Sequence, residues 1–402
     1  MTRSLLLLAA ALVTPAPAAA RTCSWQGSWM SAQMTPDANN ALPAGALNDA
    51  TLRQIVRLST GGNRVRVRVS NAFGRTPLAI GAATIARSPG NDTARVAPDS
   101  LRRVTFGGAA GVTVPPGGEW LSDPVTIAAP SFGDVAVSLH VRSEPDGQTA
   151  HAGSRATSYV VAGDRSGATD LTGATPTDHW FLLSGVEVER CAPATAILAF
   201  GDSITDGYGV KPNRNERWTD FLSRRLGGRT AVLNAGIGGN RLLLDGTGAN
   251  ALARLDRDVL GQAGVTHLIV LEGINDIGML TRDRPAGAAE HRALVAGITG
   301  AYAQIVARAR AHGVKVIGAT VLPFMANRYY HPDAASEADR QAVNDWIRAP
   351  GHFDGVIDFD RAMRDPARPA YLLAAYDSGD GLHPGIAGYR AMAEAVPLAL
   401  LQ

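Results

Sequence analysis

The pattern of apolar residues changes near residue 191, and this change limits the possible folds more than any other feature of the sequence. From residue 21 to 191, apolar and polar residues alternate in short runs, such as RVRVRV at 64–69 and DVAVSLHV at 134–141. This alternation is typical of half-buried strands, and the Gly- and Pro-rich turns between the runs favour an antiparallel sandwich or jelly-roll-like domain. After residue 195, short apolar runs alternate with helical spacing, which predicts a parallel, doubly wound α/β sheet.

The 402 residues are too many for one ordinary domain, and we expect three segments. Residues 1–20 combine an early arginine, an apolar run and a final Ala-Ala-Ala, which predicts a cleaved export signal. The alternative is a membrane anchor, but the run is shorter than the roughly 20 apolar residues that span a bilayer. Residues 21–192 would form the β domain and residues 193–402 the α/β domain, in a protein that is secreted or periplasmic without stable membrane insertion.

The overall charge argues against two classes of partner. The formal net charge is +2, and 18% of the residues are charged. Such a balance gives no basic surface that would draw the protein to nucleic acid or to an anionic membrane. The RVRVRV run is expected to place its arginines on a solvated sheet face, with binding of an acidic polysaccharide as the alternative.

The chain contains two cysteines, Cys23 and Cys191. Export would bring them into an oxidising compartment, where an even number of cysteines favours a disulfide. The alternative is two separate buried thiols. A Cys23–Cys191 bond would close a loop around the whole predicted β domain, and so long a loop would stabilise it by about 4–5 kcal/mol in the chain-entropy model.

Five buried strands and five helices are expected in the second half of the chain. The strands are at 196–200, 231–234, 267–272, 314–319 and 356–359, and the helices at 217–226, 252–260, 288–311, 335–347 and 386–401. In open sheets of this kind, ligands bind at the carboxyl ends of the strands.

Four short motifs follow predicted strands at those carboxyl ends. They are GDSI at 201–204, NAGIGGN at 234–240, GIND at 273–276 and DGLH at 380–383. Each motif alone is weak evidence, because a serine after a glycine is usually a turn residue and a glycine-rich turn can bind phosphate. Their common position at strand ends indicates one site.

The residues in these motifs are those that acyl transfer requires. The Ser203 hydroxyl becomes a good nucleophile only when a base takes its proton, and His383 would be that base. Asp380 would fix the tautomer of His383 and stabilise its charged form. The backbone N–H groups of Ser203 and Gly239 and the side-chain amide of Asn275 could form the oxyanion hole.

From about residue 195 to 402, the four motifs in this order resemble the conserved blocks of the SGNH (GDSL-type) hydrolase superfamily. The resemblance implies a flavodoxin-like, three-layer α/β/α fold without metal or cofactor, and the same roles for these five residues. Ile204 stands where many members have Leu, and Gly238 is adjacent to Gly239, so the choice between the two glycines rests on the alignment of the motif. The first half resembles the accessory β domain of some bacterial members, without a sharp motif.

The sequence therefore predicts a secreted serine esterase that hydrolyses carboxylic esters, with short acyl chains favoured. Its partner would be a small-molecule ester or an acetylated carbohydrate. Three alternatives remain: an O-acetyl esterase acting on polysaccharides, an acyltransferase, and a carbohydrate-binding protein with a vestigial site.

Overall fold

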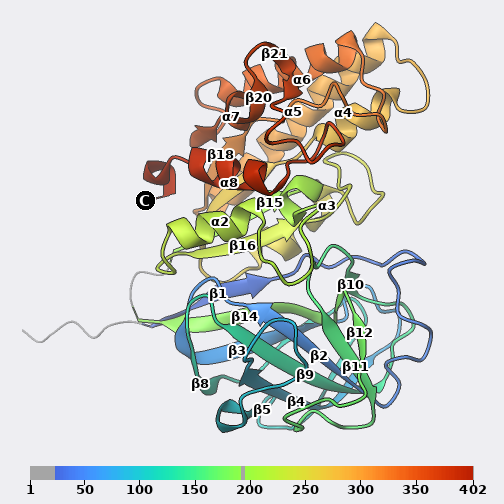
Figure 1. Ribbon diagram of the computed structural model, residues 1–402, viewed down its shortest axis with the longest axis vertical. Coiled ribbons are helices and arrows are strands. Elements are labelled where there is room, and N and C mark those ends of the chain that lie inside the picture. The colour runs from blue at the N-terminus through green and yellow to red at the C-terminus, as the bar shows by residue number, and fades with distance from the viewer. Residues whose placement is uncertain (1–22, 192–194, 402) are drawn as a thin grey trace, which may run out of the picture.

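The computed structural model describes residues 23–191 and 195–401, which form two domains stacked end to end (Figure 1). The predicted export signal at 1–20 and the predicted domain junction at 192/193 lie outside the described residues. Among the helices of the described ranges, none is both long and apolar enough to cross a membrane.

The first domain, called the β domain here, consists of two main antiparallel sheets. One sheet has the order β1-β14-β3-β7 with β8 also paired to β3, and the other has the order β12-β11-β2-β9-β4-β5 with β6 paired to β4. A short β10–β13 pair lies beside them. The strands are β1 Ser24–Met30, β2 Ala50–Arg57, β3 Gly62–Ser70, β4 Leu78–Arg87, β5 Arg102–Val104, β6 Val112–Val114, β7 Glu119–Leu121, β8 Val125–Ala129, β9 Asp134–Ser143, β10 Ala150–His151, β11 Ser158–Ala162, β12 Thr175–Thr177, β13 Trp180–Phe181 and β14 Leu183–Arg190.

The alternating runs fold as predicted because their apolar sides share one core. Val65 and Val67 of β3 lie in the same buried cluster as Val137 and Leu139 of β9, so the two sheets pack face to face. The arginines of RVRVRV form the predicted solvated face only in part, because Arg64 is exposed and Arg66 is half-buried, whereas Arg68 is not exposed. Arg68 is buried, since its guanidinium pairs with the Glu187 carboxylate at 2.7 Å and reaches a carbonyl oxygen of the second domain.

A disulfide joins Cys23, just before β1, to Cys191, just after β14. β1 and β14 are neighbouring antiparallel strands, and their pairing brings the two ends of the β domain together. The predicted disulfide is thus present, and the loop that it closes contains nearly all of the β domain.

Removal of this disulfide should destabilise the β domain by about 2–5 kcal/mol, because the unfolded chain regains the freedom of a loop with a sequence separation of 168 residues. Urea unfolding of the wild type with and without reductant, and of Cys23→Ser/Cys191→Ser, measures this. Reductant should leave the urea unfolding midpoint of the double variant unchanged. Equal unfolding midpoints for the oxidised wild type and the double variant would contradict the prediction.

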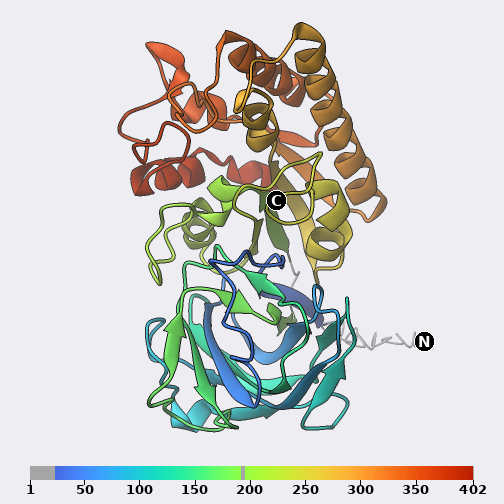
Figure 2. The ribbon, with the colours of Figure 1, turned by 90° about the vertical axis from the view of Figure 1, so that its right-hand side faces the viewer.

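The second domain has a five-stranded parallel sheet with the order β16-β15-β17-β18-β19. Numbered along the chain this order is 2-1-3-4-5, the flavodoxin-like order that the sequence predicts. Figure 2 shows helices on both sides of this sheet: α2, α7 and α8 pack together, and α5 packs with α6. The elements are β15 Ala196–Gly201, α1 Ser203–Asp206, α2 Trp218–Arg225, β16 Ala231–Gly236, α3 Ala251–Leu255, β17 Val265–Leu271, α4 Ile274–Thr281, α5 Ala288–Ala311, β18 Lys315–Ala319, α6 Ala334–Arg348, β19 Gly355–Ile357, α7 Phe359–Met363, β20 Arg364–Asp365, β21 Arg368–Leu372 and α8 Ile386–Ala395.

Two local expectations for this domain are wrong. The predicted helix 386–401 ends at Ala395, because Pro397 disfavours helical backbone at the preceding Val396, which is extended. The DGLH motif does not directly follow the last strand of the sheet. A short helix and the β20–β21 hairpin come between β19 and the motif.

The two domains meet along β1 and β16, the edge strand of the parallel sheet. The N–H of Gly27 in β1 donates to the carbonyl of Ala263 at 2.9 Å, and Leu233 of β16 packs against the glycine. A Cβ atom at position 27 would lie 2.8 Å from the Leu233 side chain, so glycine permits this close approach.

Candidate active site

The predicted nucleophile, Ser203, is the first residue of α1, directly after β15 ends at Gly201. The intervening Asp202 caps this turn, because its carboxylate accepts a hydrogen bond from the Ile204 N–H at 2.9 Å. A Cβ atom at position 201 would lie 2.3 Å from the Thr205 hydroxyl oxygen, so the tight turn requires glycine. The turn presents the Ser203 hydroxyl at the carboxyl edge of the sheet.

The DGLH motif brings the predicted base and its predicted orienting carboxylate to this hydroxyl. The distance from Ser203 Oγ to His383 Nε2 is 2.8 Å, and that from His383 Nδ1 to Asp380 Oδ2 is 2.6 Å. Burial alone would raise the pKa of Asp380, but hydrogen bonds from the His383 ring and from the backbone N–H groups of His383 and Leu382 lower it well below its usual value. Asp380 therefore stays ionised and can stabilise an imidazolium at His383.

The glycine-rich loop after β16 supplies backbone donors. The Gly238 N–H already donates to Asp206 Oδ2 at 3.2 Å. Gly239 lines the same pocket as Ser203 and His383, and its φ of 75° suits glycine. Because the Gly238 N–H is occupied, this geometry favours Gly239 over Gly238 as the donor that faces a substrate.

Asn275, in the first turn of α4, is held at both ends of its side-chain amide. Its Nδ2 donates to the Asn240 carbonyl at 2.7 Å, and its Oδ1 accepts from the Tyr330 hydroxyl at 2.6 Å. An amide nitrogen has two N–H groups, and only one of them serves Asn240. Asn275 lines the pocket, so the second N–H can serve an oxyanion.

Beneath the pocket, the guanidinium of the fully buried Arg254 ties the strand ends together. It donates to Gly201 O at the end of β15, to Ala235 O in β16 and to Asn240 Oδ1. It also contacts the Glu272 carboxylate after β17 at 3.2 Å. Burial and a neighbouring carboxylate raise the pKa of Glu272 well above its ordinary value.

These side chains open into one pocket with a volume of about 1010 Å³. Its wall beyond the motifs includes Tyr208, whose ring stacks on the His383 ring with centroids 3.9 Å apart. Tyr208 is 46% exposed, and Tyr329 on the rim is 59% exposed.

All five predicted site residues of the α/β domain line this single pocket: Ser203, Gly239, Asn275, Asp380 and His383. The sequence analysis missed the supporting residues Arg254 and Tyr330. Neither lies in a motif, and each acts through contacts between segments distant in sequence, so no local pattern could have revealed them. In the ranges that the structure describes, no three His, Cys, Asp or Glu side chains gather as a metal site.

A model of the GDSL-like Lipase/Acylhydrolase family matches residues 199–391. The C-terminal half of the chain is a GDSL-like lipase/acylhydrolase domain. The match begins within β15 and ends within α8, so it spans all four motifs, and the family resemblance predicted from them is confirmed. The second domain is called the GDSL domain below.

Individual relatives are distant. An uncharacterized lipoprotein of Bacillus subtilis (strain 168), YqeF, is 30% identical over 139 residues, which are 34% of this chain and 51% of that protein. The chain thus spans about half the length of this curated relative. A GDSL-like lipase from Bacteroides thetaiotaomicron is 20% identical, with 52% of this chain and 88% of that one covered and a TM-score of 0.38. An acetyl xylan esterase is 16% identical, with 50% of this chain and 96% of that one covered and a TM-score of 0.36.

Proposed function

We propose that this protein is an exported serine esterase that hydrolyses carboxylic esters and favours short acyl chains. The observation that carries the proposal is the unbroken hydrogen-bonded chain from Asp380 through His383 to Ser203, at 2.6 and 2.8 Å, beside Gly239 and Asn275 in one pocket. Nucleophile, base, orienting carboxylate and oxyanion donors are the parts that acyl transfer needs.

In the first half of the reaction, Ser203 Oγ attacks the ester carbonyl carbon while His383 Nε2 takes the hydroxyl proton. The carbonyl oxygen becomes an oxyanion, held by the N–H groups of Ser203 and Gly239 and by the free N–H of Asn275. The intermediate collapses as the C–O bond to the alcohol breaks, and His383 gives its proton to the leaving alkoxide. The product at this stage is an acyl ester of Ser203.

Water completes the reaction by the same groups in reverse. His383 takes a proton from water, the hydroxide attacks the acyl carbon, and the oxyanion forms again at the same donors. Collapse breaks the bond to Ser203 Oγ, which recovers its proton from His383. Asp380 holds the ring in one tautomer throughout.

The pocket wall supports a preference for short acyl chains. Among the described residues that line the pocket, the aliphatic side chains are Ala326 and Leu382, and the others are glycine, tyrosine or polar residues. Burial of each methylene gives about 0.8 kcal/mol only where apolar surface receives it. The aliphatic wall for a long acyl chain is limited to Ala326 and Leu382, and the tyrosine rings supply much of the remaining apolar surface.

Two observations support export. The Cys23–Cys191 disulfide belongs to an oxidising compartment. The Bacillus relative is described as a lipoprotein. We infer that the protein acts outside the cytoplasm, in a periplasm or outside the cell.

Hydrolysis of p-nitrophenyl esters from acetate to long chains by the mature protein tests the proposal. We expect kcat/KM to be highest for acetate or butyrate and to fall for longer chains. No hydrolysis of any ester by folded protein would overturn the proposal.

The exposed aromatic rings at the rim favour a second candidate, an esterase that removes acetyl groups from polysaccharides. Tyr208 and Tyr329 present ring faces beside the site, and such faces pack well against sugar rings. Release of acetate from acetylated xylan or pectin, compared with p-nitrophenyl acetate, separates this candidate from a general esterase.

Replacing Tyr330 by Phe should lower kcat by about tenfold and leave KM nearly unchanged. The hydroxyl of Tyr330 fixes Asn275 Oδ1, and without it the amide can turn away from the developing oxyanion. Steady-state kinetics with p-nitrophenyl acetate measures the effect, with Tyr371→Phe on the β21 strand as the matched control. A kcat for Tyr330→Phe equal to that of the control would contradict the prediction.

A further inference from the structure

The β domain contributes a buried histidine to the helix that carries the nucleophile. His151, the last residue of β10, lies against Asp206, the last residue of α1, with Nε2 to Oδ1 at 2.9 Å. The two side chains are only 4% and 5% exposed. On the other side of the ring, Nδ1 lies 2.7 Å from the carbonyl oxygen of Ala32. Both ring nitrogens thus face oxygen atoms, and these contacts on opposite sides hold the ring in one place.

The Asp206 carboxylate links this histidine to the glycine-rich loop. While Oδ1 faces His151, Oδ2 accepts from the Gly238 N–H at 3.2 Å. The next residue, Gly239, carries the N–H that we assign to the oxyanion hole. One carboxylate therefore bridges the β domain and the donor loop, and its position fixes the orientation of the peptide groups around Gly238.

The backbone of the β domain also packs directly against the Asp206 carboxylate. A Cβ atom at Gly153 would lie 1.8 Å from Asp206 Oδ2, so the backbone at 153 touches the carboxylate. Arg217 of the GDSL domain donates to the carbonyl oxygens of both Asp206 and Ser154. These contacts enclose the Asp206 carboxylate between the two domains.

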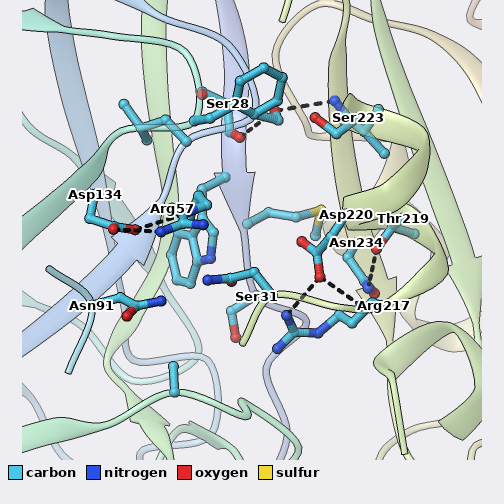
Figure 3. Close-up of a pocket in the computed structure, with 18 of the residues that line it drawn as sticks. Ser28, Ser31, Arg57, Asn91, Asp134, Arg217, Thr219, Asp220, Ser223 and Asn234 are labelled. Carbon is cyan, nitrogen blue, oxygen red and sulfur yellow. Dashed lines mark hydrogen bonds and ion pairs between the residues drawn. The ribbon is translucent and has the colours of Figure 1, made fainter. Parts of the chain in front are cut away.

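The interface beside the pair is hollow, and its lining mixes polar with apolar side chains. A cavity of about 70 Å³ lies between the domains, and both His151 and Asp206 line it. Figure 3 shows Ser28, Arg57 and Asp134 of the β domain facing Arg217 and Asp220 of the GDSL domain across this space. Apolar packing also holds the two domains together, because Met30, Ala32 and Met34 of the β domain belong to the buried core cluster of the GDSL domain. The His151–Asp206 hydrogen bond adds a directional contact to this packing.

We propose that His151 is a positioning residue for the oxyanion hole of the GDSL domain. By holding Asp206 Oδ1 it keeps Oδ2 on the Gly238 N–H and the Gly239 N–H directed into the pocket. Removing it leaves the buried Asp206 Oδ1 without its partner while the Gly238 N–H stays on Oδ2, and Asp206 and the loop must move to relieve the unpaired oxygen. The inference rests on the proposed esterase function and gives the β domain a part in turnover without a residue in the triad.

The test compares His151→Ala and His151→Gln with His179→Ala in the full chain. His179 is a matched control, because it belongs to the same domain and bonds a backbone carbonyl, that of Ala152. We expect His151→Ala to lower kcat for p-nitrophenyl acetate by about 10- to 100-fold, with KM within about threefold of the wild type. The glutamine side chain can donate a hydrogen bond to Asp206, so His151→Gln should recover part of the lost kcat.

A second measurement separates positioning from a general loss of structure. An alkyl boronic acid forms a tetrahedral adduct on Ser203 that uses the oxyanion hole, so His151→Ala should weaken its inhibition by the same factor as kcat. His179→Ala should change neither quantity. Should the alanine variant fail to fold, the glutamine variant still has to show reduced kcat and reduced boronate affinity together.

The inference is overturned if His151→Ala is folded and turns over within twofold of the wild type, or if kcat falls while boronate affinity does not. Failure of the proposed function looks different. In that case the wild type hydrolyses no ester, or its activity does not depend on Ser203, and the His151 variants have no activity to lose.

Discussion

Replacing Ser203 by Ala should lower kcat/KM for p-nitrophenyl acetate by about 10⁴-fold or more, with the fold unchanged. The hydroxyl oxygen forms the covalent bond to the acyl group, and no other nucleophile lies within reach of His383 Nε2 among the contacts of the described residues. Steady-state kinetics and circular dichroism of wild type and variant measure both parts of the expectation.

The double variant Ser203→Ala/His383→Ala provides the control. Serine and histidine act as one unit, so the double variant should be no slower than the slower single variant. If the fold-losses in kcat/KM of the two single variants multiplied in the double variant, the two residues would act independently. A Ser203→Ala variant with near-normal turnover would exclude the serine mechanism.

Replacing Asn275 by Ala should lower kcat by about 10²–10³-fold, with a much smaller change in KM. The free N–H of the amide meets negative charge that exists only in the transition state and the tetrahedral intermediate, so its loss affects turnover more than binding. Pre-steady-state and steady-state kinetics with the same substrate give kcat and KM separately.

Asn250→Ala is the matched control for this variant. Asn250 caps α3 through the Ala253 N–H and lies outside the pocket, so its loss should cost about 1 kcal/mol of stability without slowing turnover. An Asn275→Ala variant that raises KM and keeps kcat would show that the amide binds the ground state and is not an oxyanion donor.

The sequence predicts the fold and a set of residues that line one pocket, because both depend on local pattern. Strands ending in small or polar motifs place Ser203, Gly239 and Asn275 at one edge of a parallel sheet, whatever the details of packing. The parts that the sequence did not predict are contacts between distant segments. Arg254 and Tyr330 are ordinary helix and loop residues until the chain folds, and His151 belongs to another domain. The sequence predicts that the arginines of RVRVRV face solvent, because alternation identifies a strand. Alternation does not reveal which residues of other segments cover the polar side of that strand.

The order of the site residues along the chain has a consequence for biosynthesis. Ser203 and His383, its proposed base, are 180 residues apart, near the two ends of the GDSL domain, and His383 lies just before α8. A chain still being made, or one that has lost its C-terminal piece to a protease, would carry the nucleophile without the group that activates it. Unfinished or clipped molecules would therefore hydrolyse no ester by the proposed mechanism. Ester hydrolysis would begin only after His383 has been synthesised and has folded into the site.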